Sequence, residues 1–159
     1  MAFEAVVTPR VADVARYLAE QGHWLSLAML VAGTADWEYP SHCYECRQSA
    51  MRMTLELLRA AGLKPLVEVQ PGPDRLCVAL WRGDTPSVVV MCFAHGEIPQ
   101  VRVFTNVAEA YKWLKRVAGA GARVKTTPAL SEYLRRFRIE LIGPEEAELV
   151  TELRRYATA

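Results

Sequence analysis

The sequence predicts a single domain of the α/β class, and three observations support this. Segments with apolar residues at helical spacing alternate with short apolar runs bounded by glycine, proline and polar residues. The 159 residues, 52% hydrophobic and 23% charged, suit one globular domain with a substantial core. No repeat, low-complexity tract or linker divides the chain. We therefore expect one domain over residues 1–159, with a core at 1–118 and a C-terminal strand and helix extension at 119–159.

The N-terminal part is expected to hold two helices with a strand between them. The first helix begins at Thr8-Pro9, because threonine caps helices and proline suits their first turn, and it ends at Gly22. Residues 24–31 are uncharged and apolar on both faces, as in a central strand, although a helix continuing past the glycine would give the same pattern. The second helix begins near Cys43.

The middle of the chain is expected to hold strands joined by short turns. Residues 66–69 and 87–93 predict strands, and residues 101–104 return after a turn at 95–97 as a hairpin partner. Residues 74–81 are ambiguous, because their aspartate is a good helix N-cap while the apolar run after it equally suits a strand.

A helix capped by Asn106 is expected to end the core. The extension is then expected to form a strand at 123–126, a helix at 128–136, a strand at 137–142 and a helix at 144–155. In the last helix, acidic residues in the first turn and basic residues in the last turn complement the helix dipole.

Composition restricts the function classes. The net charge of +1 gives the whole chain no strong electrostatic preference for a partner. Residues 1–10 lack the pattern of a secretory signal, and the longest apolar run, 25–35, is far shorter than the ~20 residues of a membrane span. We therefore expect a cytoplasmic protein without membrane contact.

No dinucleotide or phosphate-binding glycine motif is present, so no cofactor is expected.

The most distinctive motif is Cys43-Tyr44-Glu45-Cys46, at the predicted start of a helix. The unpaired N–H groups and the dipole of a helix start favour a thiolate over a thiol, which lowers the pKa of the first cysteine. The carboxylate of Glu45 opposes this effect. In the cytoplasm such a motif is more often redox-active or metal-binding than a structural disulfide.

The order of elements over the first 118 residues resembles the thioredoxin-like superfamily, and three features carry the resemblance. The Cys-x-x-Cys motif opens a helix after an apolar run. Thr85-Pro86-Ser87 precedes a strand, with 39 residues between Cys46 and Pro86. A turn at 95–97 leads into a hairpin strand and a helix. The resemblance implies a mixed sheet flanked by helices, to which the extension at 119–159 is an addition.

The resemblance also implies roles for three residues. Cys43 would attack a disulfide of a protein partner, and Cys46 would resolve the mixed disulfide. Pro86, in a cis peptide bond, would face this dithiol. The expected function is therefore that of a thiol–disulfide oxidoreductase or a related redox protein. Whether the chain is an enzyme stays open, because a relative with the same fold can bind partners without catalysis.

Two alternatives concern the fold and the partner. If residues 76–81 form a strand, the middle of the chain becomes an antiparallel meander packed on helices, in an α+β domain that binds a protein or nucleic-acid partner. Residues 111–138 carry eight basic residues against one acidic residue, with aromatic side chains between them, and could contact nucleic acid. The stronger interpretation of this segment is a set of solvated helix faces.

A third alternative is a structural zinc site. Cys92 and His95 combine formally with Cys43 and Cys46 into the Cys₃His set that tetrahedral zinc accepts. A thioredoxin-like sheet would carry Cys92 away from the dithiol, so the two interpretations exclude each other. Outside that zinc set, Cys77 and Cys92 are expected to be small core residues.

Overall fold

The structure, a computed structural model, describes residues 9–38, 43–119, 121–137, 148 and 151–155. Three helices come first: α1 (Pro9–Glu20), α2 (Trp24–Thr34) and α3 (Tyr44–Ala60). Four strands follow: β1 (Lys64–Gln70), β2 (Arg75–Trp81), β3 (Val88–Ala94) and β4 (Gln100–Phe104). The chain continues through α4 (Val107–Ala118), β5 (Arg123–Thr126) and α5 (Pro128–Arg136), and residues 151–155 are helical as well.

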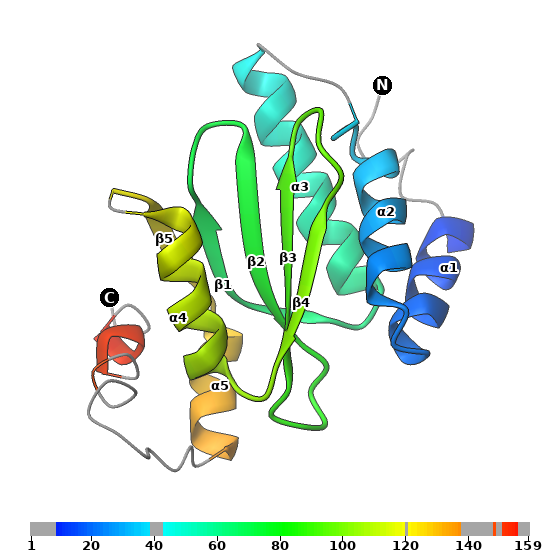
Figure 1. The fold of residues 1–159 in the computed structure, drawn as a ribbon. Helices are drawn as coiled ribbons and strands as arrows, with labels where there is room; N and C mark the ends of the chain where they lie inside the picture. The colour runs from blue at the N-terminus through cyan, green and yellow to red at the C-terminus, as the bar shows by residue number, and fades with distance from the viewer. Residues whose placement is uncertain (1–8, 39–42, 120, 138–147, 149–150, 156–159) are drawn as a thin grey trace.

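The strands form one open five-stranded sheet in the order β4-β3-β2-β1-β5, and every neighbouring pair is antiparallel. Strands β1 to β4 are a meander, and β5 returns after α4 to pair with the outer side of β1 (Figure 1). The prediction of a mixed sheet is therefore wrong, while the coarser prediction of helices packed with a sheet is confirmed. The antiparallel meander, held open as the alternative, is the arrangement observed.

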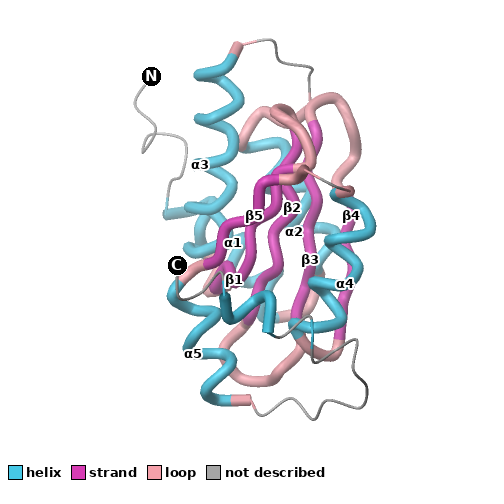
Figure 2. The backbone as a smooth tube through the Cα atoms, turned by 90° about the vertical axis from the view of Figure 1, so that its left-hand side faces the viewer, coloured by secondary structure: helices cyan, strands magenta, loops and turns pink. Residues whose placement is uncertain are grey.

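The sheet lies between two groups of helices, with α3 and α4 on opposite sides (Figure 2). Side chains alternate between the two faces along each strand. In β2, Leu76, Val78 and Leu80 pack with α1, α2 and α3, whereas Cys77, Ala79 and Trp81 pack with α4 and α5. Because both faces of the sheet are covered at β2, residues 76–81 are apolar throughout, and this is why they show no alternation in sequence.

The N-terminal part departs from expectation, because residues 24–31 belong to helix α2 and not to a strand. Gly22 has a left-handed backbone conformation, with φ 71°, and it terminates the helical turn after α1. A second helix can therefore begin two residues later. Leu27, Ala28 and Val31 are buried at helical spacing. The helix is apolar around most of its circumference, so its sequence gave no periodic signal that separates it from a buried strand.

The elements from β3 onward follow the sequence more closely. Asn106 caps α4, since its side-chain oxygen accepts the backbone N–H of Glu109 at 3.0 Å. The predicted bounds of β5 and α5 agree with the structure. The expected strand at 137–142 and the acidic first turn of the last helix lie outside the described residues, except that Phe137 follows the end of α5.

No helix in the described part of the chain is long and apolar enough to cross a membrane.

Candidate functional site

Helix α3 begins at the Cys-x-x-Cys motif, and Cys43 is its N-cap residue. Cys43 has an extended backbone, with φ −92° and ψ 120°, and its Sγ accepts the backbone N–H of Cys46 at 3.3 Å. A thiol sulfur thus takes the position that serine or aspartate oxygen usually occupies at a helix start. Further along, α3 buries Met53, Leu57 and Leu58 under the sheet, which anchors the helix and leaves its first turn in solvent.

Both cysteines of the motif are exposed and carry free thiols. The pKa of Cys43 is lowered, chiefly by the side-chain hydrogen bond from Cys46 and then by the backbone N–H of the same residue. Slight desolvation and the nearby charge of Glu45 oppose this shift. The pKa of Cys46 is raised, first because its proton is held in the hydrogen bond to Cys43. The pair therefore favours a thiolate at Cys43 and a thiol at Cys46.

This arrangement fits the chemistry expected of the two cysteines. The thiolate is the nucleophilic form of cysteine, and the lowered pKa favours it at the exposed Cys43. Cys46 lies one helical turn further on, and its backbone N–H binds the Cys43 sulfur. The role expected for its thiol is to attack a mixed disulfide formed at Cys43.

The chain that leads to this motif is anchored by Trp37, which lies between α2 and the motif. Trp37 is fully buried, and its indole N–H donates to Thr54 Oγ1 of α3 at 2.7 Å. Its ring stacks on His95 and Phe93, and its carbonyl accepts the N–H of Gly96 at 2.8 Å. A large aromatic residue inside an otherwise polar loop is the signal that could have identified this anchor.

The structure does not bring Pro86 to the cysteine pair. The peptide bond between Thr85 and Pro86, both within the described residues, is trans. Pro86 lies in the β2–β3 loop, and the neighbouring Gly83 lines a cleft together with Ala61 at the C-terminal end of α3. Since α3 spans 17 residues, about 25 Å at 1.5 Å per residue, the cysteines lie at the far end of the helix (Figure 1). The prediction that Pro86 faces the dithiol in a cis bond is wrong.

The residues of the alternative zinc set are also separated. Cys92 forms a disulfide with Cys77, its directly opposite partner on β2, and the pair lies on the α4 face of the sheet. His95 instead stacks on Trp37. Among the residues that the structure describes, no group of three or more His, Cys, Asp and Glu side chains could hold a metal ion.

The basic residues of 111–138 are spread over several surfaces. Lys115 on α4 binds Glu152, and Arg136 on α5 donates to the carbonyl of Gly83 in the β2–β3 loop. Lys125 on β5 stands opposite Glu68 of β1. Lys115, Arg136 and Lys125 therefore serve separate contacts within the domain.

Comparison of the chain with protein-family models, with curated proteins and with solved structures finds no match.

Proposed function

We propose that the protein carries out thiol–disulfide exchange with the Cys43 and Cys46 dithiol. The observation that carries the proposal is the hydrogen-bonded pair itself, in which the backbone N–H of Cys46 donates to the sulfur of Cys43 at an exposed helix start. A lowered thiol pKa at an accessible position is what distinguishes a reactive cysteine from a structural one. The neighbouring Tyr44 is 68% exposed and offers an apolar contact for a bound polypeptide.

The exchange would proceed in two steps. The Cys43 thiolate attacks one sulfur of a partner's disulfide, forming a mixed disulfide and releasing the partner's other sulfur as a thiolate that takes a proton from solvent. Cys46 then loses its proton, and its thiolate attacks Cys43 Sγ and releases the second partner sulfur. The partner gains two electrons, and the protein is left with a Cys43–Cys46 disulfide. A low-molecular-weight thiol restores the dithiol.

The proposal concerns this chemistry, in which the chain is similar to thioredoxin-like proteins, and it does not depend on their fold. The resemblance lies in the Cys-x-x-Cys motif at a helix start. The antiparallel sheet and the position of Pro86 differ from what the resemblance implies. A protein that binds its partners with little turnover would also carry the motif but would not complete the second step. The variants described below distinguish such a protein from an oxidoreductase.

Insulin reduction in the presence of glutathione tests the proposal. Wild-type protein should reduce insulin, and Cys43→Ser should abolish the activity while keeping the helix start, because serine is a good N-cap residue. When glutathione is left out, Cys46→Ser should accumulate a mixed disulfide with insulin, and dithiothreitol should release it. The matched control is Ser49→Ala, in the same helix and outside the motif, which should retain full activity. Wild-type protein without reductase activity would overturn the proposal.

A second candidate is a non-enzymatic binding protein, and one exposed surface favours it. Leu25 and Met29 lie one turn apart on α2 and are 56% and 48% exposed. Helix α2 packs against edge strand β4, where Val103 is 57% exposed. Exposed apolar side chains next to a strand edge are typical of protein contacts. If the protein is a binding protein, Leu25→Glu should abolish binding of its partner. If it is an oxidoreductase, the same variant should leave insulin reduction unchanged.

A further inference from the structure

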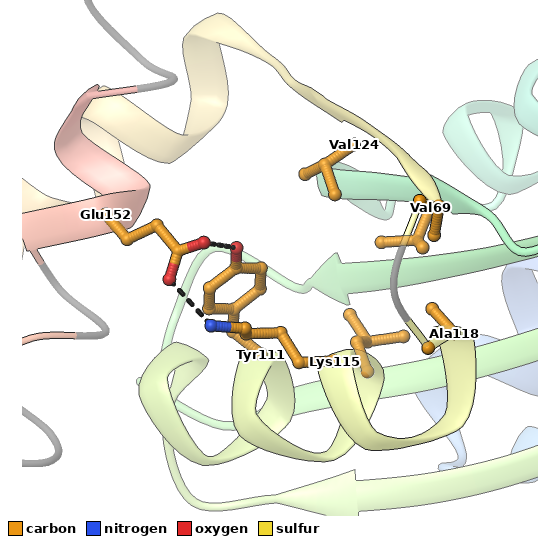
Figure 3. A pocket seen from close by; sticks show the side chains of 10 residues that line it. Val69, Tyr111, Lys115, Ala118, Val124 and Glu152 are labelled. Carbon is orange, nitrogen blue, oxygen red and sulfur yellow. Dashed lines mark hydrogen bonds and ion pairs between the residues drawn. The ribbon is translucent and has the colours of Figure 1, made fainter.

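A cavity of about 310 Å³ opens on the side of the sheet that faces α4, away from the cysteine pair. It lies between α4, strands β1 and β5, the residues Gly119, Gly121 and Ala122, and the helical residues 151–155 (Figure 3). We call it the α4 cavity. Its volume is at the lower end of the range for small-molecule sites in proteins.

The inner wall of the α4 cavity is apolar. Val69 of β1 and Val124 of β5 point into it from the sheet, and Ala118 lies at its α4 side (Figure 3). Leu114 of α4 completes this wall and, like Val69, is almost fully buried. The accessible apolar part of the wall is formed by the half-buried Ala118, Ala122 and Val124. It favours an apolar ligand body, because contact removes both surfaces from water.

The other end of the α4 cavity is polar and built from three side chains. Glu152 accepts the Tyr111 hydroxyl on one carboxylate oxygen and the Lys115 ammonium on the other, each at 2.9 Å (Figure 3). The hydrogen bond from Lys115 is the largest of the effects that lower the pKa of Glu152, so this carboxyl is ionised at neutral pH. The Tyr111 ring is buried, which fixes its hydroxyl at the edge of the apolar wall.

The hydrogen-bonding capacity of this end determines the ligand chemistry. Lysine has three donors and no acceptor, and a carboxylate has about four acceptor positions and no donor. The Lys115–Glu152 pair uses one donor and one acceptor on each other, so both can make further bonds side by side. A hydroxyl group matches this pair, since it can accept from Lys115 and donate to Glu152 at the same time.

The charge of the pair excludes charged head groups. Lys115 and Glu152 neutralise each other, so a ligand carboxylate would meet the Glu152 charge and a ligand ammonium would meet the Lys115 charge. We propose that the α4 cavity binds a small uncharged molecule with an apolar body and one hydroxyl group, such as an alkylphenol or an alcohol.

The size of the α4 cavity sets the size of the ligand. At the ~30 Å³ that one water occupies in the liquid, 310 Å³ corresponds to on the order of ten non-hydrogen atoms. 4-Propylphenol has about this size, with its hydroxyl at one end and its propyl chain at the other. Ligands of this size that fill a cavity well reach dissociation constants of about 1 mM or lower.

The test is a titration of the full chain, labelled with ¹⁵N, with three probes of matched shape. 4-Propylphenol should give saturable shifts of amide signals of Val69, Leu114 and Val124. 4-Propylbenzoate and 4-propylbenzylamine, with a negative and a positive head group, should bind at least about tenfold more weakly. Absence of saturable shifts with the phenol up to about 5 mM, or equal binding of the three probes, would overturn the proposal.

Four variants test the two ends of the α4 cavity separately. Ala118→Phe fills the apolar end and should abolish binding, whereas Val117→Phe places the same ring at the adjacent exposed position outside the cavity and should not. Glu152→Gln should weaken the phenol about tenfold, and Glu148→Gln, at an exposed position nearby, should have no effect. If Ala118→Phe fails to fold, Ala122→Leu fills the same space. Unchanged affinity in the filling variants or in Glu152→Gln contradicts the proposal.

Discussion

The hydroxyl group of Tyr133 donates a hydrogen bond to the carbonyl oxygen of Pro86 across 2.6 Å. The same phenolic oxygen accepts the backbone N–H of Val107, at the start of α4, at 3.1 Å. One buried phenol therefore joins α5 and α4 to the β2–β3 loop, and its burial raises the pKa of Tyr133 to about 12. Pro86 thus belongs to a structural contact with α5.

Tyr133→Phe should lower the free energy of unfolding. The phenylalanine keeps the ring in place but leaves the buried N–H of Val107 and the carbonyl of Pro86 without this partner, at a cost of about 1–3 kcal/mol. Urea unfolding followed by circular dichroism measures the change. Tyr17→Phe, at an exposed position on α1, is the matched control and should leave the urea midpoint unchanged. Equal stability of both variants and wild type would contradict this role of Tyr133.

A second buried polar group is Glu68, in the middle of β1. It is only 8% exposed and stands opposite Lys125 of β5. Desolvation raises the pKa of its carboxyl, and the charges of Lys125 and Arg59 compensate in part. The ionised carboxylate is therefore a net cost to the folded state.

The pH dependence of stability should reveal this cost. The folded protein holds the Glu68 proton more tightly than the unfolded chain, so its contribution is most favourable below the ordinary pKa of 4.5 and is lost as the pH rises through the folded pKa. Glu68→Gln should remove this loss and make the protein more stable than wild type at pH 7. The comparison is urea unfolding at pH 4 and pH 7. Glu56→Gln, exposed on α3, should change neither value, and a destabilised Glu68→Gln at pH 7 would contradict the argument.

The Cys77–Cys92 disulfide should contribute to stability in the oxidised protein. It closes a loop with a sequence separation of 15, and a loop of that length typically contributes about 3 kcal/mol by restricting the unfolded chain. The double variant Cys77→Ala and Cys92→Ala should lose about 2–4 kcal/mol in urea unfolding without reductant. The control is Cys43→Ser combined with Cys46→Ser, which should cost much less. A double alanine variant as stable as wild type would show that the bond adds nothing.

The local part of the fold was predictable from sequence. The predicted helix at 128–136 begins at Pro128, and the helix predicted to be capped by Asn106 begins at the next residue, because prolines and caps act within a few residues. Residues 24–31 were misassigned because a helix that is apolar around most of its circumference and a central strand have the same composition.

The long-range part was not predictable from one sequence. Pairing of Cys77 with Cys92 depends on the register of β2 and β3, which follows only once both are known to be adjacent antiparallel strands. The number of residues between Cys46 and Pro86 was compatible with a proline that faces the dithiol. That number does not determine at which end of the sheet the loop with Pro86 lies. The contact of Glu152 with Tyr111 and Lys115 likewise joins segments about forty residues apart in sequence.

The last prediction concerns the reactivity of Cys43 and separates the effects that act on its pKa. Iodoacetamide should alkylate Cys43 faster than Cys46, and the pH profile of that rate should have its midpoint below the ordinary range of a thiol. Cys46→Ala removes the side-chain donor and should move the midpoint upward, whereas Cys46→Ser keeps a hydroxyl donor and should move it less. Mass spectrometry of tryptic peptides measures each rate.

Glu45 acts on the same thiol with the opposite sign. Its charge raises the pKa of Cys43, so Glu45→Gln should move the midpoint of the rate profile downward. Glu56→Gln removes an equal charge from the same helix, but eleven residues from Glu45, or about 16 Å along the axis, which exceeds the screening length of about 10 Å at 0.1 M salt. It should leave the profile unchanged. A Cys43 that reacts no faster than Cys46, with a profile insensitive to Cys46→Ala and Glu45→Gln, would show that the helix start does not activate the thiol, and the binding function carried by α2 and β4 would replace the redox function.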